Sequence, residues 1–260
     1  MKHWQEYLAE ALGLGLFMVS AGIVATALDS PNSPLHALIA NADLRRVLAG
    51  VAMGLTAIGL IYSPWGKRSG AHLNPAVTLA FLRLKKIQPR DAAFYVAAQF
   101  SGGLIGVLLV AGLLGPSFAD TPVSFAATMP GPRGVTVAFL AELVISFVLL
   151  FTILQVASHP RHSERAGLVA GVLVALYISV EAPLSGMSMN PARSFASAAP
   201  GAFWQNLWIY FVAPPLGMLL ATQVYLSRHR AHYAGCAKLV HDPEYRCIHC
   251  GHDPAPRSAS

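Results

Sequence analysis

Three cysteines and one histidine near the end of the chain have spacing that suits a metal site. They read Cys236-x4-His241-x5-Cys247-x2-Cys250 and include every cysteine of the 260-residue sequence. Three thiolates and one imidazole suit tetrahedral zinc, and Cys-x2-Cys is a common ligand spacing. The pattern predicts either a zinc site in this tail or free thiols on a tail without fixed structure.

A second candidate group is a tripeptide that occurs twice, as Asn74-Pro75-Ala76 and as Asn190-Pro191-Ala192. Asn is a favoured N-cap of helices, and Pro fits the first helical position. Each copy therefore predicts a helix start, with short helices over 77–84 and 193–199. Because neither helix is long enough to cross a bilayer, we interpret both as half-helices that meet by their N-termini.

The residues before each Asn are expected to be extended. Non-helical backbone at membrane depth is tolerated where it lines a water-filled cavity. The Asn amide can accept the cap bond through its oxygen and offer its NH₂ to a pore, and the two helix N-termini place positive potential there, which repels cations. The candidate pore-lining loop residues are Gly70, Ala71, His72, Leu73, Gly186, Ser188 and Met189.

The elements that must position these loops are apolar. Charged residues make up 12% of the chain and hydrophobic residues 55%, and a membrane span needs roughly 17–25 apolar residues. The first segment resembles a signal peptide, but its apolar run is longer than usual and Glu10 interrupts it. We therefore predict spans over 7–28, 44–62, 92–119, 134–157, 166–180 and 202–227, with the fifth running on past Glu181.

The two halves of the chain match each other. Ala9-Glu10 in the first half corresponds to Ala141-Glu142 in the second, and Gly50-x-x-x-Gly54 corresponds to Gly167-x-x-x-Gly171. Three spans per half give the copies opposite orientation in the membrane, which is the inverted-repeat arrangement. We predict a channel domain over 1–230, with repeats over about 5–119 and 134–228, and a separate tail over 231–260.

Basic residues gather on the side of the two termini. The positive-inside rule therefore places both termini in the cytoplasm of a multi-pass protein of the cell (inner or plasma) membrane. The formal charge of +6 needs no nucleic-acid partner, and a reducing cytoplasm disfavours disulfides in the tail.

The segments Ser-Gly-Ala-His-Leu-Asn-Pro-Ala-Val-Thr and Ser-Gly-Met-Ser-Met-Asn-Pro-Ala-Arg-Ser resemble the two signature loops of the aquaporin (major intrinsic protein) family, of bacterial or nodulin-26-like type. The resemblance covers about residues 5–228. It implies an all-α membrane protein with six transmembrane helices and two re-entrant half-helices around a central pore. It also implies a passive channel for water or small uncharged solutes such as glycerol, a homotetramer, and no cofactor for the pore.

The resemblance assigns a selectivity constriction to Met53, Ile178, Met187 and Arg193. An Arg in the first turn of a membrane half-helix opposes the helix dipole, which marks it as functional. The water-selective pattern has histidine at the position of Ile178 and an aromatic residue at that of Met53, so this ring is expected to pass glycerol. Four other positions follow the water-channel pattern instead, namely Ser194, Ala198, Tyr210 and Phe211.

Two intramembrane carboxylates, Glu10 and Glu142, lie at matching places in the repeats. They could relay protons, but we favour a structural role in which each accepts bonds from the loop beside it. His72 is either pore-lining or packed within its loop. An ion- or proton-coupled secondary transporter would also use inverted repeats and broken helices. A membrane-embedded enzyme would need paired catalytic groups, and neither glutamate has such a partner nearby in sequence.

Overall fold

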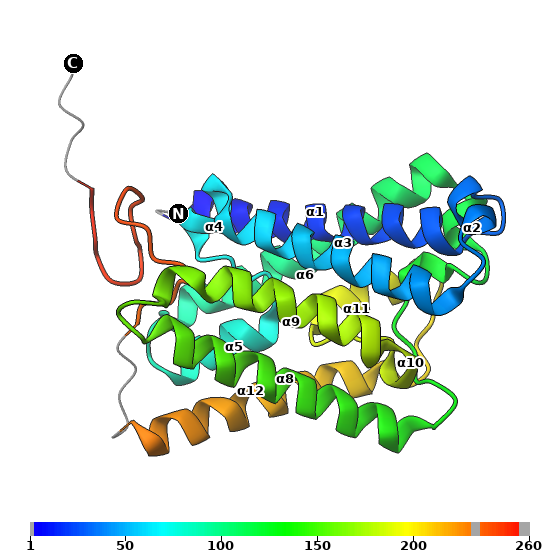
Figure 1. The fold of residues 1–260 in the computed structure, drawn as a ribbon. Coiled ribbons are helices and arrows are strands. Elements are labelled where there is room, and N and C mark those ends of the chain that lie inside the picture. The colour runs from blue at the N-terminus through cyan, green and yellow to red at the C-terminus, as the bar shows by residue number, and fades with distance from the viewer. Residues whose placement is uncertain (1–2, 230–234, 255–260) are drawn as a thin grey trace.

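The computed structural model describes residues 3–229 and 235–254, and most of that part of the chain is helical. Six of the described helices are long and apolar enough to cross a membrane. Figure 1 shows the N-terminus and the tail segment 235–254 at one end of the bundle, and helix α2 at the other. Residues 1, 2, 230–234 and 255–260, which the predicted domains include, lie outside the described residues.

The helix order confirms the predicted fold class of spans and half-helices. The spanning helices are α1 (Trp4–Asp29), α3 (Ala42–Tyr62), α6 (Pro89–Leu114), α8 (Val135–Ala157), α9 (Ala166–Val180) and α12 (Trp208–Arg228). The half-helices are α5 (Pro75–Arg83) and α11 (Pro191–Ala198). Short connecting helices are α2 (Pro34–Leu38), α4 (Pro64–Ser69), α7 (Pro116–Ala119), η1 (Ser124–Ala126), η2 (Ser163–Arg165) and α10 (Ala182–Ser185).

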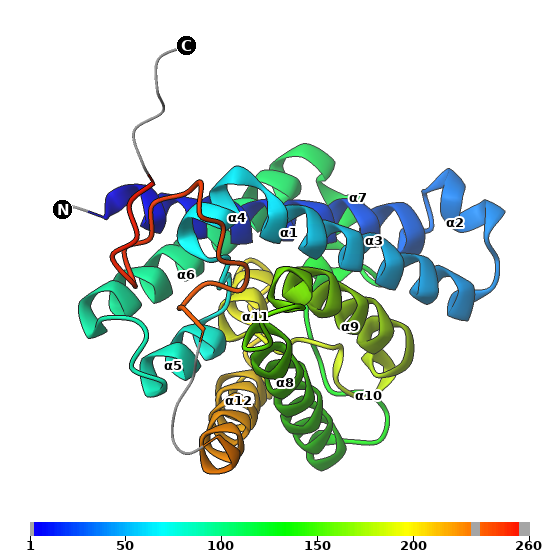
Figure 2. The ribbon, with the colours of Figure 1, turned by 60° about the vertical axis from the view of Figure 1, so that its left-hand side comes forward.

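The packing follows the inverted repeat. Within each half the first and third spans lie together, α1 with α6 and α8 with α12, while α3 and α9 pair across the halves. Each half-helix packs on the third span of the opposite half, α5 on α12 and α11 on α6. In Figure 2, α11 lies near the middle of the long helices and α5 lies between α6 and α12. Each half therefore completes the interior of the other.

Small residues bring α3 and α9 together. A Cβ on Gly54 would lie 2.6 Å from the carbonyl oxygen of Gly171, and a Cβ on Gly171 would lie 2.6 Å from the carbonyl oxygen of Gly54. Such backbone contact supplies the van der Waals packing that holds helices together in lipid. Glycines of both pairs seen in the sequence thus lie where the backbones of α3 and α9 are in contact.

Three predicted bounds were wrong. The third span ends at Leu114, because Gly115 takes a φ of 53° and Pro116 then begins α7. The fifth span does not run past Glu181, which is its C-cap. The sixth begins at Trp208 rather than at 202, since left-handed residues precede it. At Gly115 and before Trp208, local backbone geometry sets a helix bound that composition alone would have placed elsewhere.

The outer surface of the bundle is apolar. Large side chains on the long helices face outward, including Leu113 at 80% and Val180 at 68% exposure. In water an apolar surface of this extent would be unstable, but in a bilayer it is solvated by the lipid chains. The fold is that of a multi-pass membrane protein.

Candidate functional site

The two Asn residues cap the half-helices. The side-chain oxygen of Asn74 accepts from the N–H of Ala76 at 2.8 Å, and that of Asn190 accepts from Ala192 at 3.0 Å and from Arg193 at 3.2 Å. Each Asn has an extended backbone, and the following Pro takes the first helical position. The residue types thus produce the helix starts for the reasons inferred from sequence.

The amide nitrogens of these residues join the two halves. Asn74 Nδ2 donates to the Met189 carbonyl at 2.7 Å, and Asn190 Nδ2 donates to the Leu73 carbonyl at 2.8 Å. We expected the whole NH₂ group to face the pore. One N–H of each amide is instead used across the repeat interface, so at most one remains for a solute.

The loop backbones before the two Asn residues are non-helical but not extended as predicted. Gly70, Ala71 and Leu73 have φ of 102°, 53° and 47°, and the second loop repeats the pattern at Gly186, Met187 and Met189. Left-handed φ in non-glycine residues is strained, so surrounding contacts must hold these loops in place.

Glu10 supplies those contacts to the first loop. Its carboxylate is fully buried and accepts from Leu73 N at 2.6 Å, from His72 N at 3.0 Å and from the Ser69 hydroxyl at 2.7 Å. Gln99 Nε2 also donates to it, at 2.7 Å. The sequence reasoning missed Gln99, because a single polar residue inside an apolar helix gave no repeat to compare it with.

Glu142 does the same for the second loop. It is fully buried and accepts from Ser188 N at 2.6 Å, from Met189 N at 2.7 Å and from the Ser185 hydroxyl at 2.7 Å. The geometry therefore matches the structural interpretation of both glutamates. The Ser185 hydroxyl also lies 2.5 Å from a carboxylate oxygen of Glu181, so its one proton is shared between two carboxyl groups. Glu181 is a second buried carboxyl near this loop that the sequence reasoning did not single out.

A cavity of about 230 Å³ runs between the helices. The four proposed constriction residues, Met53, Ile178, Met187 and Arg193, all line it. Both Asn side chains and most of the candidate loop residues line it as well; the lining includes Ala71, His72, Leu73, Asn74, Gly186, Ser188, Met189 and Asn190. The structure thus brings the two loops and the constriction residues to one continuous space.

The four residues of the water-channel pattern lie elsewhere. Ser194 contacts the Thr128 and Ser188 hydroxyls at 2.6 and 2.5 Å, and Tyr210 donates to the Ser185 carbonyl at 2.5 Å. Ala198 is buried, and Phe211 is 40% exposed. Ser194 and Tyr210 thus bond to the second loop from outside the cavity lining, whereas the constriction residues line the cavity.

Arg193 lies half-buried at the start of α11 and lines the cavity. Its Nη1 contacts Ser197 Oγ at 3.4 Å, and within the described residues no carboxylate forms an ion pair with it. A cation without a paired anion next to two helix N-termini makes the local potential positive.

His72 is packed rather than open to the cavity on all sides. It is 3% exposed, and its ring stacks on Phe81 with centroids 4.8 Å apart. Nδ1 lies 3.1 Å from Thr78 Oγ1, and Nε2 donates to the Ala237 carbonyl at 2.9 Å. The second hydrogen-bond partner of His72 thus comes from the tail, a contact that could not be predicted from the sequence.

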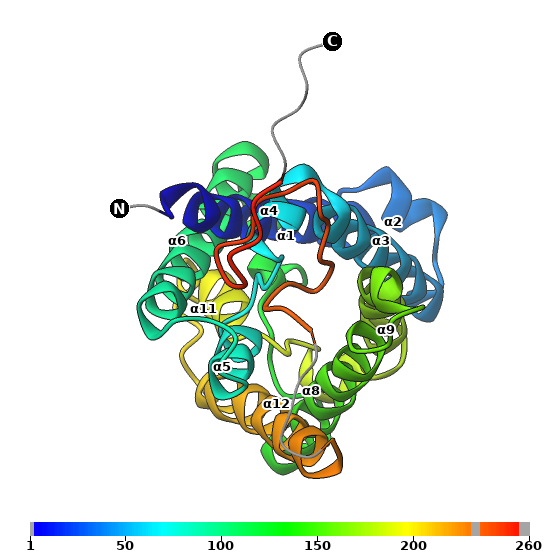
Figure 3. The same cartoon turned by 90° about the vertical axis from the view of Figure 1, so that its left-hand side faces the viewer.

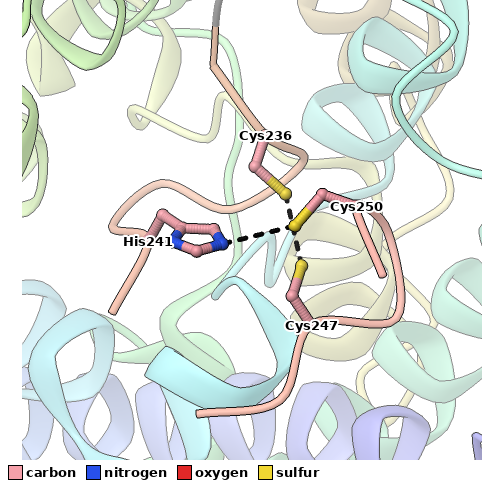
Figure 4. A group of neighbouring side chains, drawn as sticks. All are labelled: Cys236, His241, Cys247 and Cys250. Atoms are coloured by element: carbon pink, nitrogen blue, oxygen red, sulfur yellow. Dashed lines mark hydrogen bonds between the residues drawn. The ribbon is translucent and has the colours of Figure 1, made fainter. Parts of the chain in front are cut away.

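The tail brings its four candidate ligands together, as Figure 4 shows. One ligand atom from each of Cys236, His241, Cys247 and Cys250 lies within 4.8 Å of the others. Cys236 Sγ is 3.3 Å from Cys247 Sγ, and His241 Nε2 is 3.4 Å from Cys250 Sγ. Tetrahedral zinc with bonds of about 2.0–2.3 Å requires ligand separations of roughly 3.5–3.8 Å, so the group is close to that geometry.

The other two histidines of the tail have different partners. His252 Nε2 donates to the Pro243 carbonyl at 2.8 Å, and His249 packs between His72 and Tyr95. Burial lowers the pKa of His249 to about 4. His241 is therefore the imidazole that the fold offers to the three thiols.

Cys236 and Cys247 share a hydrogen bond that favours the thiolate on Cys247, while the same bond and burial raise the pKa of Cys236. The Cys236 thiol and the backbone N–H groups of Cys250 and His249 hold the pKa of Cys247 well below its usual range. Gly251 takes a φ of 77°, which lets the chain turn so that its own N–H reaches the Cys247 carbonyl at 3.0 Å. The buried Lys238 ammonium also lies near the three sulfurs.

Comparison with known proteins agrees with this geometry. A family model for the major intrinsic proteins matches residues 1–225. Aquaporin NIP1-2 of Arabidopsis thaliana is 34% identical over 230 residues, which are 85% of this chain and 73% of that protein. The putative aquaporin NIP4-1 of the same plant is 38% identical over 176 residues, 67% of this chain and 60% of that protein.

A solved structure supports the fold. The X-ray structure of the aquaglyceroporin from Plasmodium falciparum superposes with a TM-score of 0.73 at 24% identity, covering 86% of this chain and 95% of the other. The family match ends before Cys236, so it does not extend to the cluster of thiols. The chain belongs to the major intrinsic protein family, whose members are channels for water and small neutral solutes and not enzymes.

Proposed function

We propose that residues 1–230 form a passive channel for water and small uncharged solutes. The observation that carries this proposal is that both Asn residues and Arg193 line the same cavity. A neutral solute can exchange hydrogen bonds with these groups, while the half-helix N-termini and Arg193 repel cations and protons.

The proposed solutes include glycerol as well as water. Ile178 and Met53 line the same cavity as the polar groups and give it apolar surface for the carbon backbone of a polyol. An apolar side paired with Arg193 suits a molecule that is polar on one side only, whereas a ring of polar groups suits water alone.

Stopped-flow measurements on proteoliposomes test both proposals. The reconstituted protein should raise permeability to water under a sucrose gradient and to glycerol under a glycerol gradient, without electrical conductance. Flux that requires a proton or sodium gradient would refute the channel and favour a coupled transporter. Exclusion of glycerol with water permeability intact would refute the assignment of the constriction.

We propose that both termini lie in the cytoplasm of a cell that carries this protein in its plasma or inner membrane, and that the protein is a homotetramer. The N-terminus and the tail lie at the same end of the bundle (Figure 1), and basic residues gather there. The exposed apolar faces of the long helices suit contact with lipid or with further copies. Labelling of Glu244→Cys, an exposed tail position, in sealed and in permeabilised cells tests the orientation, and cross-linking in membranes tests the copy number.

We also propose that Cys236, His241, Cys247 and Cys250 hold one zinc ion. The donor set is three thiols and one imidazole, and the Lys238 ammonium balances the single negative charge that zinc and three thiolates would carry. Elemental analysis of protein purified without a His-tag should give one zinc per chain. Zinc far below that ratio, with all three thiols reactive, would refute the site.

A further inference from the structure

The tail is packed into the channel as part of its core. Residues 237–240 are buried, with exposures of 0% for Ala237, 2% for Lys238, 5% for Leu239 and 7% for Val240. Ala237, Leu239 and Val240 belong to the same hydrophobic cluster as Ala71 of the first pore loop. Four consecutive buried residues outside any helix indicate a docked segment, not a tail in solvent.

This docked segment binds the backbone of the first pore loop. His72 Nε2 donates to the Ala237 carbonyl at 2.9 Å, and Leu239 N donates to the Gly70 carbonyl at 3.1 Å. A Cβ on Gly70 would lie 2.7 Å from the Ala237 oxygen, so the two backbones are in direct contact. The tail thus occupies two polar groups that would otherwise be free to bind a solute.

Leu239 also lines the cavity itself, together with His72 and Ile61. Asp29, at the far end of α1, lines the same cavity. Viewed from the end of the bundle that carries the termini, Figure 3 shows the tail lying across the ring of long helices. The side chain of Leu239 therefore sits in the path that a solute would follow at this end.

Polar contacts hold the outer part of the tail. Lys67 Nζ pairs with Asp242 at 2.9 Å, and Lys238 Nζ donates to the carbonyls of Lys67 at 2.8 Å and Arg246 at 3.0 Å. His249 lies edge-on to Tyr95, with ring centroids 5.8 Å apart. These contacts tie the thiol-bearing loop to α4 and α6.

Two of the four candidate ligands flank the docked segment directly. Cys236 directly precedes Ala237, and His241 directly follows Val240. So short a segment has no core of its own, and metal-ligand bonds would supply the free energy that fixes its shape. Loss of the metal would free both ends of the docked segment at once.

From these contacts we propose that the tail is a zinc-dependent plug, in which zinc bound to Cys236, His241, Cys247 and Cys250 holds Leu239 in the cytoplasmic mouth of the pore and closes it. Removal of zinc opens the channel. The ligand is a soft divalent cation with the coordination preferences of zinc, and it acts at a site outside the path of the solute. This inference rests on the proposed channel function and on the proposed zinc site.

The test uses the full-length chain in proteoliposomes, with osmotic water flux measured in buffered zinc and then after a membrane-permeant zinc chelator. If zinc holds about nine channels in ten closed and its removal opens them, chelation should raise permeability by about tenfold, and added zinc should reverse the change. Two variants distinguish the effect of zinc binding from the effect of the Leu239 side chain in the pore. Cys250→Ser should lose zinc and conduct at all zinc concentrations, because this exposed residue supplies a ligand and no packing.

Leu239→Asp should keep one zinc per chain yet conduct in its presence, because a carboxylate is not stable in the apolar contact that Leu239 makes. Glu244→Gln, an exposed change in the same loop, should behave like the wild type.

Wild-type flux that is equal with and without zinc, and equal to that of Leu239→Asp, would overturn the plug but leave the channel. Opening by Leu239→Asp but not by chelation would overturn the role of the metal. Permeability at the level of empty liposomes for every variant, with and without zinc, would overturn the channel itself.

Discussion

Replacing Glu10 tests the idea that each buried carboxylate serves as the backbone partner of a pore loop. Glu10→Leu removes the acceptor for two buried N–H groups, those of His72 and Leu73. Each unpaired buried donor costs about 1–3 kcal/mol, so the variant should lose roughly 2–6 kcal/mol. That is a large share of a typical stability of about 5–15 kcal/mol.

Glu10→Gln should cost less. The amide oxygen can keep Leu73 and Gln99 as donors, while the amide nitrogen then faces Ser69, whose hydroxyl can turn to accept. One N–H, that of His72, is left without an acceptor, for a loss of about 1–3 kcal/mol. Glu142→Gln should cost a similar amount, since it too can keep all but one backbone donor.

Thermal unfolding in detergent and water flux in proteoliposomes measure the effect. At roughly 2–4 °C per kcal/mol, Gln should lower the midpoint by roughly 2–12 °C, and Leu should lower it further or prevent folding. Glu244→Gln is the control. If Glu10→Leu unfolded at the wild-type temperature with wild-type flux, the structural role would be refuted. If Glu10→Gln were stable but abolished a flux driven by a pH gradient, the proton relay would be the correct interpretation.

Three further changes test the pore and the packing. Ile178→His should narrow the constriction and lower the ratio of glycerol flux to water flux by about tenfold, as is common when a solute no longer fits a pocket. An unchanged ratio of the two fluxes would show that Ile178 does not face the solute. Asn190→Ala should lose about 2–4 kcal/mol through its cap and the orphaned Leu73 carbonyl, measured against the exposed Asn32→Ala, and equal melting of the two would contradict the cross-repeat bond. Gly54→Leu should prevent assembly, because its Cβ alone would lie 2.6 Å from a backbone oxygen, whereas Gly59→Leu, with open space around it, should yield normal amounts of folded protein in membranes.

The fold could be predicted from sequence because its signals are local or repeated. Six apolar runs fix the spans, and each Asn-Pro pair fixes a helix start through cap chemistry that needs no tertiary context. The predicted helix bounds were wrong where a helix ends within an apolar run, as at Gly115. The φ of that residue cannot be read from hydropathy.

The long-range contacts could not be predicted from the sequence. Nothing in the spacing of Asn74 reveals that its amide reaches Met189, and the left-handed φ of Ala71 goes against its intrinsic preference. Likewise, the thiol spacing predicted a metal site but not that the residues between the ligands dock on His72. Such contacts depend on how separate helices place their backbones, which a single sequence does not encode locally.

The crossed bonds between the two Asn amides and the opposite loops have a consequence for biosynthesis. When the ribosome has delivered only the first repeat, the Leu73 carbonyl and the Asn74 amide have no partner, because Asn190 and Met189 have not yet been made. An unpaired polar backbone is not stable at membrane depth, so the first loop must remain near the hydrated surface until the second arrives. The crossed bonds therefore require both repeats to be present before either loop can take its final position.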